Sequence, residues 1–141
     1  MTWRAYSHGR GAVLNLLLDT HVALWAITDS PNLPQKARDM IQSPRTTVWV
    51  SAANVWETAI KHALGQGDMP VSSQDAVRYF QESGYRLLPI EAEHAVTVEE
   101  LPVYHQDPFD RILVAQAFVE PMRLMTRDPL VALYSDTVIK V

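Results

Sequence analysis

Four acidic residues stand beside apolar runs, where a carboxylate costs free energy unless positive charge accompanies it. They are Asp19, Glu57, Asp110 and Asp128. Carboxylate oxygens are the ligands that hard divalent cations prefer, and such a cation activates water against a phosphate group. If these four side chains converge in the folded chain, the sequence predicts a metal site for phosphate chemistry.

Each of these acids also has an ordinary structural interpretation. Asp19 and Asp128 are suitable N-cap residues, and Asp110 suits the first turn of a helix. Glu57 and Lys61 stand four residues apart with the acid first, which is a favourable surface pair worth only ~0.2–0.5 kcal/mol. The joint occurrence of the four acids at strand-to-helix junctions and in one apolar helix favours the metal site, but each alternative stays open.

Hydroxyl and basic residues next to these acids are candidates for supporting roles. The hydroxyls can orient carboxylates or bound water, although helix capping explains Ser51 equally well. The arginines can hold phosphates or simply balance charge, and the sequence does not decide between the two. The hydroxyl residues are Thr20, Ser51 and Thr126, and the arginines are Arg111 and Arg127.

The histidines carry a weaker signal. His62, His94 and His105 do not have the spacing of a zinc site, and the sequence contains no H-E-x-x-H motif. His21 follows Asp19 by two residues and could face the same site, but we expect it to pack in the first helical turn.

The elements that must position these residues follow from hydrophobic periodicity, because short β-branched runs alternate with longer helical patterns. Strands are predicted at 14–18, 46–50, 85–88, 123–126 and 137–141. Helices are predicted at 21–28, 33–41, 51–64, 72–83, 89–100 and 107–118, with a short one from 128. This alternation predicts a three-layer α/β/α domain with a mostly parallel central sheet. Open α/β sheets bind ligands at the carboxyl ends of their strands, where three of the four acids are expected.

Composition is compatible with such a domain. The chain of 141 residues has no cysteine, which excludes thiolate ligands and suits a reducing cytoplasm. It has no apolar run of the ~20 residues needed to span a membrane. Without the four proposed site acids, twelve acids remain against 12 Lys and Arg, so the net charge of −4 neither supports nor excludes a nucleic-acid partner. We expect one domain at 14–141 after a flexible leader at 1–13.

Four sequence blocks together resemble a known family. The first runs from Leu16 to His21 and continues with Leu24-Trp25, and the second is Ser51-Ala52-Ala53-Asn54-Val55-Trp56-Glu57 with Lys61. The third is His105-Gln106-Asp107-Pro108-Phe109-Asp110-Arg111 with Ala115-Gln116-Ala117, and the fourth is Thr126-Arg127-Asp128. In this order the blocks resemble PIN-domain ribonucleases, and among them the VapC-like toxins of bacterial toxin–antitoxin pairs.

The resemblance implies a PIN-like fold and a toxin that hydrolyses single-stranded or looped RNA with metal-activated water. It implies that Asp19, Glu57, Asp110 and Asp128 are the catalytic residues and bind Mg²⁺ or Mn²⁺. Asp107 is implied as an outer residue of the same cluster rather than a ligand. The implied partners are RNA, a cognate antitoxin and a second copy of the chain. Supporting or substrate-contacting roles are expected for Thr20, Ser51, Lys61, Asp107, Arg111, Thr126 and Arg127.

Three other functions share part of this sequence pattern. A catalytically weak PIN-like module for RNA or protein binding remains an alternative, although the four retained acids favour an enzyme. An aspartyl-phosphate phosphatase normally has a second Asp two residues after the first, and here that position is His21. A phospho-receiver needs a lysine after a late strand, whereas Lys140 falls inside the last predicted strand.

Overall fold

The computed structural model describes residues 13–66 and 68–141. Their five strands form one parallel sheet in the order β3-β2-β1-β4-β5. The strands are β1 (Leu14–Leu18), β2 (Thr46–Ser51), β3 (Arg86–Leu88), β4 (Arg123–Thr126) and β5 (Ile139–Lys140). The predicted leader, apart from Val13, lies outside the described residues.

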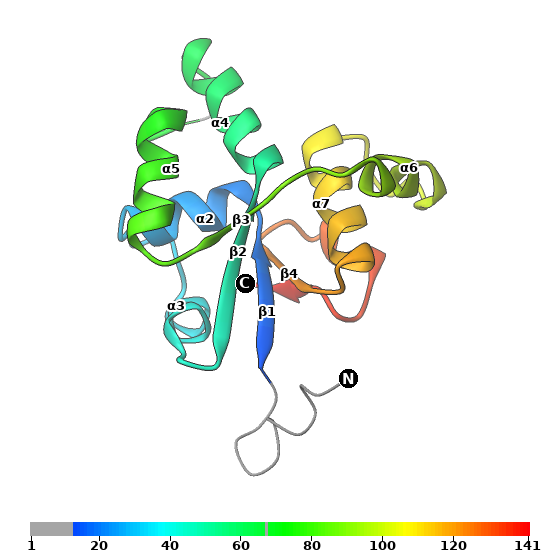
Figure 1. Cartoon of the computed structure of the whole chain (residues 1–141), viewed down its shortest axis with the longest axis horizontal. Helices are drawn as coiled ribbons and strands as arrows, with labels where there is room; N and C mark the ends of the chain where they lie inside the picture. Colours follow the sequence, from blue (N-terminus) through cyan, green and yellow to red (C-terminus); the bar gives the residue numbers. More distant parts are fainter. Residues whose placement is uncertain (1–12, 67) are drawn as a thin grey trace.

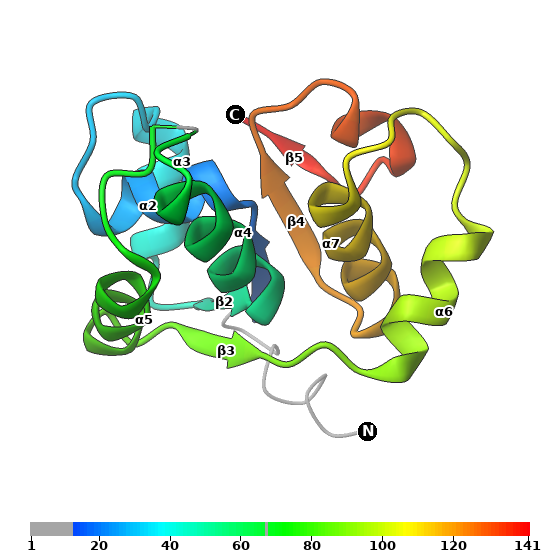
Figure 2. The same ribbon diagram turned by 90° about the horizontal axis from the view of Figure 1, so that it is seen from above.

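Helices cover both faces of this sheet (Figures 1 and 2). They are α2 (Thr20–Ile27), α3 (Gln35–Gln42), α4 (Ala52–Ala63), α5 (Ser73–Glu82), α6 (Ala92–Glu100) and α7 (Pro108–Val119). Figure 2 shows α2, α3 and α5 on one side of the strands and α6 and α7 on the other. The predicted α/β/α fold with a parallel sheet is therefore confirmed.

Successive side chains of the central strand point to opposite faces of the sheet, which explains why the domain has two core layers. In β1, Leu16 and Leu18 pack with the residues of α2, α3 and α5, whereas Leu17 packs with those of α7. All three leucines are completely buried, as expected for a strand that lies between two helical layers. This burial fixes the position of β1 and therefore of Asp19, which follows it at the end of the sheet.

The element boundaries differ from the predictions mainly where side chains compete with regular backbone structure. The short helix expected from Asp128 is a 3-10 turn, η1 (Val131–Tyr134), because the Asp128 carboxylate accepts the Leu130 N–H and forms a turn first. The helix expected from Pro89 begins at Ala92, and the last strand shortens to two residues. None of the helices within 13–66 and 68–141 has the length and apolar character needed to cross a membrane.

Candidate metal centre

A small cavity of about 140 Å³ opens where β1 and β4 end. Its lining residues are Asp19, Thr20, His21, Glu57, Lys61, Asp107, Asp110, Arg127 and Asp128. From β1, the chain adds β2 and β3 on one side of the sheet and β4 and β5 on the other. The cavity therefore lies at the point where the strand order changes direction. Parallel α/β sheets bind ligands at this position, and all four proposed site acids line the same cavity.

The Asp19 carboxylate, at the end of β1, accepts three hydrogen bonds. Its Oδ1 accepts the Val22 N–H at 2.9 Å, so it does cap α2 as its ordinary interpretation requires. Its Oδ2 accepts the Thr126 hydroxyl at 2.6 Å and the Arg127 N–H at 3.4 Å, both from the end of β4. The cap and the cavity position are therefore compatible. Burial raises the pKa of Asp19 even though these hydrogen bonds favour the charged form.

Glu57 projects from α4 and is only 4% exposed, which rules out the surface-pair interpretation. Its two carboxylate oxygens accept hydrogen bonds from the Thr20 hydroxyl and the Lys61 ammonium, each at 2.5 Å. Asn54 in turn donates from Nδ2 to the Thr20 hydroxyl at 3.0 Å. Both oxygens of Glu57 thus have fixed directions before any ligand binds.

Asp107 and Asp110 occupy the start of α7. The Asp107 carboxylate caps the helix by accepting the N–H groups of Phe109 and Asp110, at 2.9 and 3.3 Å. Pro108 occupies the first turn, where its missing N–H costs nothing. Asp110 is thereby placed with its carboxylate in the cavity.

Asp110 and Asp128 approach His105, which precedes α7. The Asp110 Oδ2 lies 3.3 Å from the His105 Nε2, and the other ring nitrogen lies 3.0 Å from the Tyr134 hydroxyl. One potential ligand atom from each of His105, Asp110 and Asp128 lies within 4.8 Å of the others. The described part of the chain can therefore offer a cation two carboxylates and an imidazole at this corner of the cavity.

The electrostatics of the cavity favour a cation. Burial, followed by the negative charges of Asp107, Asp19, Glu57 and Asp128, raises the pKa of Asp110 to about 8. Burial lowers the pKa of Lys61, but the hydrogen bond and charge of Glu57, with the charges of Asp107 and Asp110, outweigh this effect and raise it. A donor set of crowded carboxylate oxygens fits a hard divalent cation, since such a cation would relieve their repulsion.

Two expected supporting residues lie elsewhere. The Ser51 hydroxyl accepts the Ala53 N–H at 2.9 Å and caps α4, as its ordinary interpretation states. The Arg111 guanidinium donates to the Tyr134 hydroxyl at 2.9 Å and to backbone carbonyls, including those of Pro102 and Val98. Neither residue lines the cavity, so a direct contact of Arg111 with a substrate phosphate is not supported by its position. Thr20, Lys61, Asp107 and Arg127 do line the cavity, and Thr126 contacts Asp19.

Two residues near this site, His105 and Asn54, were not proposed as site residues from the sequence. His105 was considered as a zinc ligand and as part of the third sequence block, but not as a neighbour of Asp110, which follows it by five residues. Asn54 could have been recognised as the third helical residue after a Ser51 cap, because such a residue returns a hydrogen bond to the cap backbone. The structure shows this bond, from the Ser51 N–H to the Asn54 Oδ1 at 2.6 Å. His21, which was expected to pack in the first turn of α2, lines the cavity instead.

Comparisons with known proteins agree with this fold. A model of the PIN domain family matches residues 16–133. No curated protein matches the chain. Among solved structures, VapBC2 from Rickettsia felis bound to a DNA fragment from its promoter has a TM-score of 0.64, at 15% identity over 91% of this chain and 98% of that one.

Two further solved structures are similar to the chain. DNA-bound VapBC from Salmonella typhimurium has a TM-score of 0.63, at 14% identity over 91% of this chain and 97% of that one. FitAcB from Neisseria gonorrhoeae has a TM-score of 0.59, at 18% identity over 89% and 96%. At these identities the likeness concerns the fold.

Proposed function

Because the chain belongs to the PIN domain family, we propose that it is a divalent-metal-dependent endoribonuclease and the toxin of a toxin–antitoxin pair. PIN domains are generally nucleases that use a divalent metal ion. The observation that carries the proposal is the single cavity of about 140 Å³ lined by Asp19, Glu57, Asp110 and Asp128. These four acids come from four separate segments of the chain and meet only in the folded protein.

In this proposal the four acids hold Mg²⁺ or Mn²⁺. When bound, the cation supplies Lewis acidity that activates water for attack on phosphorus and offsets the charge that develops there. Thr126 and the Val22 N–H orient Asp19, while Thr20 and Lys61 orient Glu57. The His105 Nε2 lies 3.3 Å from the Asp110 Oδ2 and helps to orient that carboxylate.

The substrate proposal rests on the shape and charge around the cavity. Arg127 is exposed at its edge and can hold a phosphate, whereas Arg111 is engaged by backbone carbonyls. A cavity of this size admits a phosphodiester and cations but not a paired helix, so a single-stranded or looped RNA is proposed.

A cognate antitoxin and a second copy of the chain are proposed as partners. The resemblance to VapC-like toxins supports the antitoxin, as does the fold that the chain shares with VapBC from two organisms. Large apolar side chains that remain exposed, such as Trp56 at 58% and Val96 at 65%, are compatible with protein partners. A cytoplasmic location is proposed with them.

The first test is metal-dependent cleavage of a labelled single-stranded RNA by the purified chain. Asp110→Asn should lower the cleavage rate at least about 100-fold. Substitution of residues that only support a metal ligand already lowers metal affinity or activity by roughly 10–100-fold. Circular dichroism should show that the variant remains folded.

A matched control is Asp75→Asn. Asp75 also lies in the first turn of a helix, α5, but it pairs with Arg78 on the surface and does not line the cavity. This variant should cleave at the normal rate. Full activity of Asp110→Asn, or cleavage that resists EDTA, would contradict the proposed function, and a chain that binds RNA without cutting it would instead support the binding module.

A further inference from the structure

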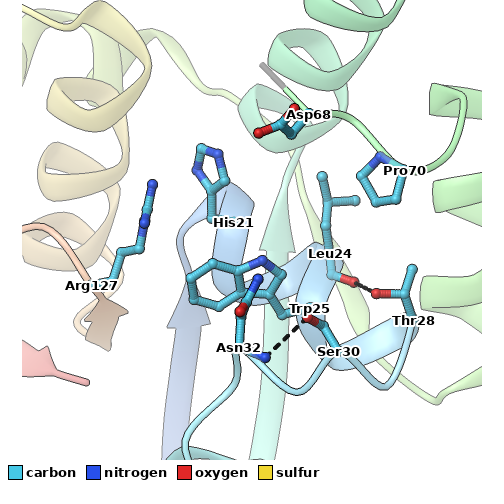
Figure 3. Close-up of a pocket in the computed structure, with 9 residues that line it drawn as sticks. All are labelled: His21, Leu24, Trp25, Thr28, Ser30, Asn32, Asp68, Pro70 and Arg127. Atoms are coloured by element: carbon cyan, nitrogen blue, oxygen red, sulfur yellow. Dashed lines mark hydrogen bonds between the residues drawn. The ribbon is translucent and has the colours of Figure 1, made fainter.

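A second cavity, of about 290 Å³, adjoins the acidic one (Figure 3). It is lined by His21, Leu24, Trp25, Thr28, Ser30, Asn32, Asp68, Pro70 and Arg127. His21 and Arg127 line both cavities, so the two cavities adjoin at these side chains. The second cavity is therefore next to any group that occupies the acidic one.

One wall of the second cavity is an aromatic surface with the Arg127 guanidinium over part of it. The Arg127 guanidinium carbon lies 5.2 Å from the centroid of the Trp25 ring, within cation–π range. The His21 ring lies 6.1 Å from the Trp25 ring with an interplanar angle of 59°. Figure 3 shows His21 and Trp25 rising from α2, with Arg127 approaching from β4. Planar, electron-rich groups stack on such a surface.

The remaining walls combine apolar and polar groups. Leu24 and Pro70 are apolar, whereas Asn32, Ser30 and Asp68 bring amide, hydroxyl and carboxylate groups. The Ser30 hydroxyl accepts the Asn32 N–H at 3.1 Å, which holds this loop against the cavity. Within residues 13–66 and 68–141, no hydrogen bond engages the side chain of Asn32 or of Asp68. Both are available to donors and acceptors on the edge of a ligand.

We propose that this second cavity binds the nucleobase next to the scissile phosphate, with Trp25 as its stacking platform and Asn32 as a residue that reads its edge. The inference rests on the proposed ribonuclease function and deepens it, because it assigns base preference to a defined site. Unstacked RNA bases are recognised in proteins by aromatic stacking together with hydrogen bonds to their edges.

Size and charge favour a base over a bare phosphate. A volume of about 290 Å³ approaches the ~300–1,000 Å³ of ordinary small-molecule pockets, whereas the acidic cavity holds about half of that. Arg127 is the only Lys or Arg among its lining residues in the described chain, and Asp68 opposes it. A free anion would therefore gain little there, but a neutral planar ring attached to a phosphate at Arg127 would gain stacking and hydrogen bonds.

The test uses a fluorescein-labelled eight-nucleotide uridine RNA and a series in which one base at a time is removed. Binding is measured by anisotropy in the Asp110→Asn background, where no cleavage is expected. Adding Trp25→Leu should weaken binding about 10-fold, the order of one base–aromatic stack. With Trp25 present, removing the base at one position of the RNA should weaken binding by a similar factor. With Trp25→Leu, removing the same base should leave the affinity unchanged, as a double-mutant cycle requires. Trp25→Phe, which keeps a ring, should retain most of the binding.

Trp49→Leu is the matched control, because the Trp49 ring also lies near an arginine, with the Arg86 guanidinium carbon 5.7 Å from its centroid. Trp49 lines neither cavity, so this variant should keep the original dependence on base position. If the wild-type chain cleaves RNA but base removal has the same effect with and without Trp25→Leu, the base-binding proposal is wrong and the ribonuclease proposal stands. A chain that neither binds nor cleaves RNA would overturn both proposals.

Discussion

Asp110 lies among four other carboxylates, and within residues 13–66 and 68–141 no arginine or lysine forms a salt bridge with it. Its nearest described polar partner is His105, at 3.3 Å, and its pKa of about 8 reflects burial first and then the charges of the neighbouring acids. Near neutral pH and without metal, this carboxyl group therefore holds a proton that it must lose when a cation binds. The protonation of one residue thus couples pH, stability and metal binding.

We predict that the metal-free chain becomes less stable as pH rises. Folded Asp110 retains its proton up to about pH 8, whereas the unfolded residue loses it near its ordinary pKa of 3.8. The folded state binds more protons between these values, so the free energy of unfolding falls across this window and is highest below it. Each pKa unit corresponds to about 1.4 kcal/mol.

The measurement is urea unfolding in EDTA between about pH 5 and 9. Because Asp110→Asn removes the titrating group, the wild type should lose at least about 1 kcal/mol more than this variant over the range. Parallel pH profiles for the two proteins would show that the Asp110 carboxyl does not titrate as described.

The element that links structure to site most directly is α4. Its first turn carries a capping box, in which the Ser51 hydroxyl accepts the Ala53 N–H and the Asn54 side chain accepts the Ser51 N–H. Asn54 also donates to Thr20, which donates to Glu57. The cap of one helix is therefore joined, through two side chains, to a carboxylate of the metal site.

This link predicts different results for two similar substitutions. Ser51→Ala should cost roughly 0.5–2 kcal/mol of stability, as the loss of a helix cap does, while Mg²⁺ affinity in the folded protein stays unchanged. Asn54→Ala should lower stability similarly but also weaken Mg²⁺ binding by about 10-fold, because Thr20 loses its support. Isothermal titration calorimetry and urea unfolding measure the two quantities. Equal Mg²⁺ affinities would show that the Thr20 contact does not matter.

At the scale of the whole molecule, the sheet joins residues that are far apart in sequence. The Thr126 hydroxyl binds the carboxylate of Asp19 across a separation of 107 residues, and Trp56 of α4 meets Phe109 of α7 with ring centroids 5.2 Å apart. Both halves of the chain thus supply carboxylates to one cavity. A cation that binds there would connect these halves and stabilise the folded state.

We predict that Mg²⁺ raises the free energy of unfolding. A ligand at 100 times its dissociation constant stabilises the folded state by about 2.7 kcal/mol. Thermal unfolding with increasing MgCl₂ should follow this relation in the wild type and show a much smaller rise in Asp110→Asn. NaCl at equal ionic strength is the control, because it screens exposed charges without binding the site. An equal effect of the two salts would contradict a specific site.

The predicted elements and the observed ones agree most closely where the sequence pattern is strong. The predicted first strand, 14–18, coincides with β1, and Ser51 begins α4 as expected. Agreement is weakest near Asp128, where a local carboxylate hydrogen bond replaces the start of a regular helix. A single side-chain hydrogen bond of this kind depends on the local conformation of Asp128, and hydrophobic periodicity does not predict it.

By itself, the sequence determined the α/β alternation and the acids that follow β1, lie in α4 and begin α7, because periodicity and helix-start chemistry are local properties. Tertiary structure alone decided that these acids share one cavity with His21 and His105, and that the Arg111 guanidinium is held by backbone carbonyls away from it. The reason is physical: which side chains meet depends on strand order and crossover geometry, and these arise from contacts between segments distant in the chain.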